Sequence, residues 1–116
     1  MARTDDRART TSVPTLRLVL STVPPRRAGP IAKALVVAGV AACVNVVRGV
    51  RSVYRWRGRV HDEAEALLIV KTPRTRLAAC VRAHVAAHPY AVPEVVVVAP
   101  GRAGAAYDAW ARVAVR

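Results

Sequence analysis

Aromatic residues are scarce in this sequence. It has two Trp, three Tyr and no Phe among 116 residues, although 53% of the residues are hydrophobic. A core with so few rings must consist mainly of Val, Leu, Ile and Ala, which suits a thin layer of helices on a sheet. The length fits one domain. We therefore expect a single domain of mixed secondary structure.

Cysteine and long apolar segments are also scarce. Cys43 and Cys80 are the two cysteines, and neither belongs to a CxxC pair or a zinc-finger pattern. No apolar run approaches the roughly 18 residues of a membrane helix, and the N-terminus lacks the apolar segment of a secretory signal. We expect a cytoplasmic protein with reduced thiols that does not associate with membranes.

Signatures of catalysis and of nucleic-acid recognition are missing. The sequence has no P-loop, GxSxG or HExxH motif, so we do not expect an enzyme. Seven acidic residues against nineteen Lys and Arg give a formal net charge of +12, which permits binding to many anions. The arginines are spread along the chain and are not clustered with base-stacking aromatics, so specific nucleic-acid binding is not expected.

A long β-ribbon pattern dominates the middle of the chain. The outgoing arm covers Ala42–Trp56, the turn is Arg57-Gly58, and the returning arm covers Val60–Lys71. Side chains alternate along a strand, so Tyr54 and Trp56 share one face of the outgoing arm. A two-stranded ribbon is only marginally stable by itself. The ribbon must therefore lie across the rest of the domain or across another subunit.

Shorter elements flank this ribbon. We predict a strand over Leu16–Ser21 and an amphipathic helix that opens at Pro24-Pro25 and stops at Gly39. A second helix is predicted to start with Thr72 as N-cap and Pro73 as its first residue. A fully buried strand over Val95–Val98 and a last helix from about Ala103 follow. The apolar stripes of the two later helices are Leu77, Val81, His84, Val85 and His88, and Tyr107, Trp110, Ala111 and Ala114.

The order of these elements predicts the fold. Strand, helix, strand, strand, helix, strand gives an α+β, ferredoxin-like βαββαβ sandwich with a long hairpin between its second and third strands and an extra C-terminal helix. We expect a flexible N-terminal tail over residues 1–14 and one domain over residues 15–116. Two helices would cover one face of the sheet. The other face would remain bare and apolar, so we expect an oligomer.

Several motifs occur in one order along the chain, and their residues are Ala41-Ala42-Cys43-Val44-Asn45, Ser52-Val53-Tyr54-Arg55-Trp56, Gly58, Glu65, Lys71-Thr72, His88-Pro89-Tyr90, Val92-Pro93-Glu94, Tyr107 and Trp110. These ordered motifs resemble one known family, the CutA divalent-cation tolerance proteins. The resemblance extends from about Leu16 to Arg112, with two departures: Val40 stands where the family usually has Leu, and Ala91 where it usually has Glu. It implies a ferredoxin-like homotrimer with inward-facing sheets and a hairpin that reaches a neighbour.

The resemblance also implies a role in tolerance of divalent metals, with Cu(II) or Zn bound at clefts between subunits. The metal-ligand candidates are Cys43, Glu65, His88 and Glu94. A thiolate is a soft ligand suited to copper or zinc, but Cys43 also fits a buried core position. His84 and His88 have helical i, i+4 spacing, which permits chelation, yet both lie on an apolar stripe and also suit the core.

A second hypothesis is a signalling or scaffold trimer, similar in fold to PII-type regulators, that binds a small anion. The high positive charge favours this reading. Lys71 would contact the anion or pair with Glu94, because an unpaired Lys at the end of an apolar strand is costly to bury. Tyr54 and Trp56 would either stack on a ligand or anchor an interface between subunits.

Overall fold

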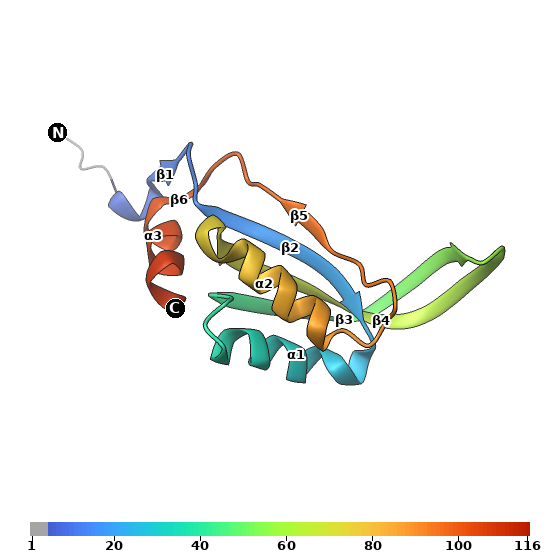
Figure 1. Cartoon of the computed structure of the whole chain (residues 1–116). Coiled ribbons are helices and arrows are strands. Elements are labelled where there is room, and N and C mark those ends of the chain that lie inside the picture. Colours follow the sequence, from blue (N-terminus) through green and yellow to red (C-terminus); the bar gives the residue numbers. More distant parts are fainter. Residues whose placement is uncertain (1–4) are drawn as a thin grey trace.

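The computed structural model describes residues 5–116 and contains a four-stranded antiparallel sheet in the order β3-β4-β2-β5. Helices α1 and α2 lie on one face of this sheet, and α3 lies at the end opposite the hairpin (Figure 1). The predicted ferredoxin-like βαββαβ order is confirmed, together with the extra C-terminal helix. The main elements are β2 (Leu16–Val23), α1 (Pro25–Val37), β3 (Cys43–Trp56), β4 (Arg59–Pro73), α2 (Arg74–Ala87), β5 (Val96–Val98) and α3 (Ala105–Ala114).

The hairpin of β3 and β4 extends well beyond the body of the domain, as Figure 1 shows. The molecule consequently measures 63 × 28 × 21 Å. Arg57 and Gly58 form the predicted turn, with φ angles of 51° and 76°. Positive φ at both central residues is typical of the type I′ turn, whose twist matches that of the flanking strands. A bulge between Val47 and Val50 separates the part of β3 within the sheet from the projecting part.

Strand β4 is central in the sheet, and its segment Leu67-Leu68-Ile69-Val70 is apolar on both faces, a pattern typical of a central strand. Its residues Ala66, Leu68 and Val70 are at most 1% exposed and face the helices, where they pack with Ile31 and Leu35 of α1. Because opposed residues of antiparallel strands point to the same side, the pairing register defines the other face of the sheet. It consists of Leu18, Leu20, Cys43, Asn45, Val47, Leu67, Ile69, Lys71, Val96 and Val98.

This second face is largely bare within one chain. Val47 is 40% exposed, and Val96 and Val98 are 48% and 38% exposed. Strand β5, expected to be fully buried over Val95–Val98, is instead an exposed edge strand of three residues. Its apolar composition misled the prediction, because nothing within residues 5–116 covers this edge.

The start of α2 also differs from the prediction. Thr72 is a strand residue, fully buried, and its hydroxyl donates a hydrogen bond to the Val40 carbonyl at 2.7 Å. Pro73 takes the N-cap position, and the helix begins at Arg74. The buried face of α2 is also narrower than the predicted apolar stripe. Cys80 and His84 are buried, whereas Val85, a predicted stripe residue, is 43% exposed.

Residues 5–14 contain short regular elements, whereas the sequence predicted a flexible tail over residues 1–14. Residues 1–4 lie outside the described residues. Asp6–Ala8 form a short 3-10 helix (η1), and β1 (Thr10–Thr11) pairs with β6 (Ala103–Gly104) beside α3. The structure thus differs from the prediction where the segment meets the C-terminal part of the chain, a contact that no local pattern reveals.

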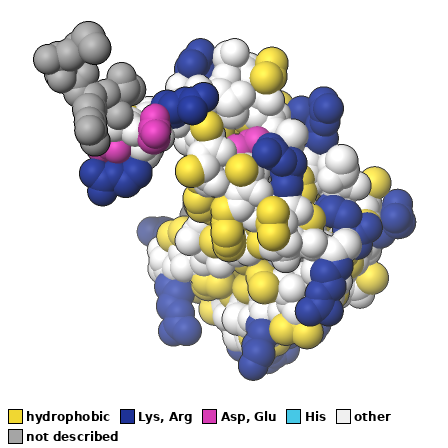
Figure 2. All heavy atoms as spheres, turned by 90° about the vertical axis from the view of Figure 1, so that its left-hand side faces the viewer, with side chains coloured by type: hydrophobic (Ala, Val, Ile, Leu, Met, Phe, Trp, Pro, Cys, Tyr) yellow, Lys and Arg dark blue, Asp and Glu magenta, His cyan; other side chains and the backbone are white. Residues whose placement is uncertain are grey.

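Helix α3 is anchored through a charged side chain, unlike the expected apolar stripe. Asp108 and Ala111 are its buried residues, whereas Tyr107 and Trp110 are 39% and 48% exposed. Figure 2 shows this end of the molecule, with Lys and Arg side chains standing around scattered hydrophobic ones. Within residues 5–116, no helix has both the length and the apolar character needed to cross a membrane.

Candidate functional site

A cleft of about 750 Å³ lies between the projecting hairpin and the connector that follows α2. The alternation of β3 brings Ser52, Tyr54 and Trp56 to the same side as Glu65 of β4, and the connector closes the cleft from the opposite direction. The lining residues are Thr22, Ser52, Val53, Tyr54, Trp56, Arg57, Glu65, Pro89, Tyr90, Ala91, Val92 and Glu94.

The connector wall is fixed by a chain of hydrogen bonds. Tyr90 donates its phenolic hydrogen to Glu65 Oε2 at 2.9 Å, and its backbone N–H donates to His88 Nδ1 at 3.2 Å. His88 Nε2 lies 2.9 Å from the Thr22 carbonyl. A carbonyl can only accept, so Nε2 carries the proton and both ring nitrogens of His88 are occupied. His88 therefore holds the wall of the cleft in place.

Burial and the Glu65 carboxylate together keep the Tyr90 hydroxyl protonated. Burial of the phenol, followed by its hydrogen bond to Glu65, raises the pKa of Tyr90 far above its usual value. The hydroxyl therefore stays protonated and remains a donor at physiological pH. Glu65 is only 5% exposed, so this hydrogen bond satisfies part of a nearly buried carboxylate.

The hairpin wall has a similar arrangement. Tyr54 donates its hydroxyl hydrogen to Glu63 Oε2 at 2.9 Å, and this hydrogen bond raises the pKa of Tyr54. The ring of Tyr54 stacks on His61, with centroids 5.1 Å apart and an interplanar angle of 12°. The guanidinium carbon of Arg57 lies 5.8 Å from the ring centroid of Trp56. Both aromatic rings of this wall thus have defined neighbours.

The cleft concentrates the acidic residues of a basic protein. The chain has only three glutamates, at positions 63, 65 and 94. Two of them line the cleft, and the third bonds the hydroxyl of a lining tyrosine. Arg57 is the basic residue among the lining side chains. The local charge is therefore acidic, in contrast to the net charge of the chain.

Cys43 and Lys71 lie elsewhere. They oppose each other in the β3–β4 register, and six strand residues, about 20 Å at 3.3 Å per residue, separate Lys71 from Glu65. Lys71 Nζ lies 5.6 Å from the Tyr107 ring centroid, and none of the described acidic residues forms an ion pair with it. Burial, followed by the nearby Cys43, raises the pKa of Tyr107.

His84 and Cys80 occupy the core between α2 and the sheet. His84 is 1% exposed, its Nε2 lies 2.7 Å from the Ser21 hydroxyl oxygen, and its ring meets that of His88 edge-on at 5.4 Å. Burial raises the pKa of the Cys80 thiol to about 11, so it remains neutral. The helical spacing of the two histidines therefore serves packing, with no chelating geometry between them.

The structure brings together only part of the predicted site. Tyr54, Trp56, Glu65 and Glu94 all line the cleft, and His88 supports it from behind. Across residues 5–116, no three His, Cys, Asp or Glu side chains are grouped closely enough to hold a metal ion. The sequence analysis named neither Tyr90 nor Glu63 as a candidate site residue. Glu63 was detectable, because alternation places it on the Glu65 face.

Known proteins resemble this chain over nearly its whole length. Residues 17–114 match the family model described as CutA1 divalent ion tolerance protein. A divalent-cation tolerance protein CutA from Thermus thermophilus is 44% identical over 96 residues, which are 82% of this chain and 93% of that protein. The solved structure of CutA from Synechococcus elongatus has 35% identity and a TM-score of 0.90, and the match covers 97% of this chain and 100% of that one.

A second similar solved structure is that of a PII-like protein. It is the PII-like protein CutA from Nostoc in apo form, with 29% identity and a TM-score of 0.82, covering 86% of this chain and 97% of that chain. The family match, the identities and the fold agree with one another. This chain belongs to the CutA1 family of divalent ion tolerance proteins.

Proposed function

We propose that this protein is a homotrimer that contributes to divalent-cation tolerance by binding a divalent cation in the cleft, where a neighbouring subunit completes the site. The observation that carries this proposal is the gathering of all three glutamates around one cleft of a chain with a net charge of +12. Local carboxylates outweigh a distant positive charge, because salt screens charges beyond about 8 Å under physiological conditions.

The side chains present fit part of a cation site. Glu65 and Glu94 would supply carboxylate oxygens, which suit hard divalent cations such as Mn²⁺. His88 uses both ring nitrogens within the chain, and Cys43 lies at the far end of the strand pair. Cu(II) or Zn would therefore need nitrogen or sulfur ligands from a neighbour. Ala91 lines the cleft where the family usually has Glu, which removes one further carboxylate.

The bare sheet face is the surface that the proposed trimer would cover. Its apolar residues alternate along β4 with the same phase as Glu65, so the bare face continues into the side of the hairpin that lines the cleft. A second copy seated on Leu67 and Ile69 would therefore border the cleft and could add ligands to it. We propose this arrangement for the trimer and for its three clefts.

The same cleft argues against the small-anion hypothesis. The Nostoc relative is described as PII-like, but three carboxylates around the cleft of this chain face one lining Arg57. An anion placed there would be repelled. Lys71, the residue expected to contact an anion, lies outside the lining residues.

The test is a calorimetric titration of the metal-free protein with Mn(II), Cu(II) and Zn(II). We expect saturable binding that weakens by about tenfold or more in a Glu65→Gln, Glu94→Gln variant, since two charged ligands are lost. Cys43→Ala is the matched control and should leave the affinity unchanged. If the control abolished binding while the glutamine variant bound normally, the cation site would lie at the Cys43 end and the cleft assignment would be wrong.

A further inference from the structure

The cleft is aromatic as well as acidic. Of the two Trp and three Tyr in the chain, Trp56, Tyr54 and Tyr90 line it. Each remains accessible, with exposures of 43%, 39% and 39%. The carboxylates of Glu65 and Glu94 lie among these rings. Three accessible rings are a large share of the aromatic surface of a protein that has so few.

The faces of these rings would contribute little to the binding of a bare metal ion. Metal ions take oxygen, nitrogen or sulfur ligands, and the tyrosine hydroxyls here are engaged with Glu63 and Glu65. The faces of aromatic rings, in contrast, attract organic cations through their quadrupole, and aromatic cages recognise methylated ammonium groups in this way. Rings combined with carboxylates therefore indicate a cation that has an apolar surface.

The chain already uses one ring in this way. The Arg57 guanidinium lies 5.8 Å from the Trp56 ring centroid, a cation–π contact at an exposed position. The other two rings are held by their hydroxyl groups, because Tyr54 is bonded to Glu63 and Tyr90 to Glu65. Rings fixed before a ligand arrives lose little conformational entropy on binding.

We propose that the cleft binds a small organic ammonium ion, with its charge among the carboxylates and its methyl or methylene groups against Tyr54, Trp56 and Tyr90. The volume of about 750 Å³ is ample for such a ligand. The inference rests on the proposed function in using the same cleft and the same carboxylates, but it names a different class of ligand. Arg57 is then a resident cation that competes with the ligand at Trp56.

The experiment titrates the full-length protein with choline and, separately, with 3,3-dimethylbutan-1-ol, the uncharged molecule of the same shape. Choline should bind saturably, and the alcohol should bind about tenfold more weakly or not at all, because only the cation interacts with ring faces and carboxylates. Equal binding of the two molecules, or no binding of choline, would overturn the proposal.

Two variants locate the site. Trp56→Leu should weaken choline binding by about tenfold while leaving the affinity for Mn(II) unchanged, which separates this proposal from the metal site. Arg57→Asn removes the competing cation and keeps the turn, because Asn-Gly is the preferred type I′ sequence. It should tighten choline binding, a gain that damage to the fold cannot mimic. Choline affinity unaltered in both variants would place the ligand elsewhere.

The outcomes also distinguish the two proposals from each other. Binding of Mn(II) without choline would leave the metal function standing and overturn the ammonium inference. Binding of choline without any metal, sensitive to both Trp56→Leu and Glu65→Gln, would support the inference and contradict the metal function.

Discussion

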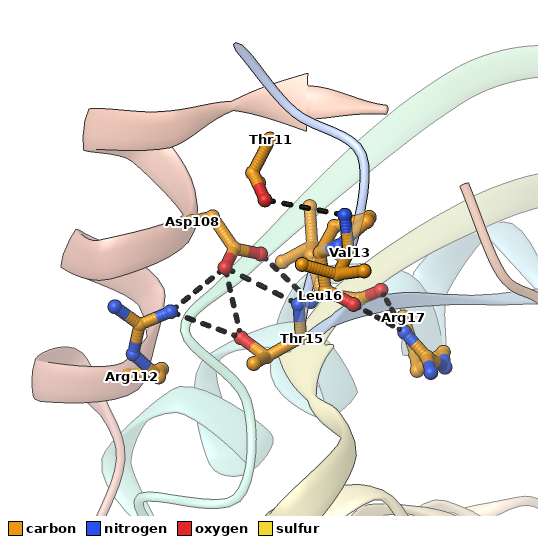
Figure 3. A network of polar contacts seen from close by, with 8 residues as sticks. Thr11, Val13, Thr15, Leu16, Arg17, Asp108 and Arg112 are labelled. Carbon is orange, nitrogen blue, oxygen red and sulfur yellow. Dashed lines mark hydrogen bonds and ion pairs between the residues drawn. The ribbon is translucent and has the colours of Figure 1, made fainter. Parts of the chain in front are cut away.

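Asp108 shows how one polar residue fixes a helix that an apolar stripe was expected to hold. It is 2% exposed, and its Oδ1 accepts the Leu16 N–H at 2.8 Å. Its Oδ2 accepts the Thr15 N–H and hydroxyl at 3.2 and 3.0 Å and pairs with Arg112 at 2.8 Å, as Figure 3 shows. Burial alone would raise the pKa of Asp108, but these donors and the charge of Arg112 outweigh burial and lower it.

Replacing this carboxylate should destabilise the fold. In Asp108→Asn, the amide N–H₂ would face donors that now bond to Oδ2, and we expect a loss of about 2 kcal/mol in the free energy of unfolding. Urea denaturation at fixed protein concentration measures it. Asp5→Asn, at an exposed ion pair with Arg7, is the control and should change nothing measurable. An unaltered midpoint for Asp108→Asn would show that the network is dispensable.

His84 makes stability depend on pH. Burial, followed by the charge of His88, lowers the pKa of His84 from 6.5, and its buried Nδ1 has no hydrogen-bond partner among the described residues 5–116. The unfolded chain therefore binds a proton more readily than the folded chain does. Stability from this residue is present above pH 6.5 and is lost as the pH falls below it.

We accordingly expect the free energy of unfolding to fall between about pH 6.5 and 5, by at most about 1.4 kcal/mol per pH unit for one proton. His84→Gln should flatten this slope, whereas His61→Gln on the hairpin should preserve it. Denaturation curves across the pH range provide the measurement. A slope that survives in His84→Gln would assign the pH dependence to another group.

At the scale of elements, Gly29 inside α1 and Gly39 after α1 have different conformational roles. Gly39 lies after the helix with φ +74°, and a Cβ there would lie 2.8 Å from the Arg116 Cβ. Gly29 lies inside α1 directly before Pro30, and a proline ring crowds the Cβ of a helical residue that precedes it. Gly39 is required by the backbone, and Gly29 lets the helix include Pro30 without that crowding.

Unequal effects should therefore follow from the same substitution. Gly39→Ala should lower the stability by about 1 kcal/mol or more, because φ and space both oppose it. In Gly29→Ala, crowding against Pro30 offsets the gain in helix propensity of up to about 1 kcal/mol, so we expect little net change in stability. Thermal unfolding of the two variants and of the parent protein measures both changes in stability. Equal shifts of the same sign would contradict these roles of the two glycines.

For the whole molecule, the bare sheet face is the decisive feature. Val47 is 40% exposed on that face, whereas Val113, which belongs to α3 and not to the sheet, is 84% exposed. A buried charge without a partner is costly in an interface. If the chain forms the trimer proposed above, Val47→Glu should therefore reduce it to smaller species in sedimentation experiments, whereas Val113→Glu should not. A Val47→Glu protein that remains a trimer would show that subunits meet through another surface.

The periodic patterns of the chain were sufficient to predict the layers of the fold. Alternation located the hairpin, and the doubly apolar Leu67–Val70 segment marked β4 as central, because each pattern reports local burial. Contacts between segments far apart in sequence escaped prediction. Two such contacts are the pairing of β1 with β6 and the hydrogen bonds that Asp108 accepts from Thr15 and Leu16.

The candidate site likewise has one part that the sequence predicts and another that only the tertiary structure determines. Strand alternation alone placed Tyr54 and Trp56 on one face, because side chains have a fixed period of two. Only the tertiary structure decided that Glu65 and Glu94 meet them in one cleft and that Cys43 and Lys71 do not. The reason is physical: the connector after α2 returns to the hairpin through hydrogen bonds of His88 and Tyr90, and no local pattern encodes that return.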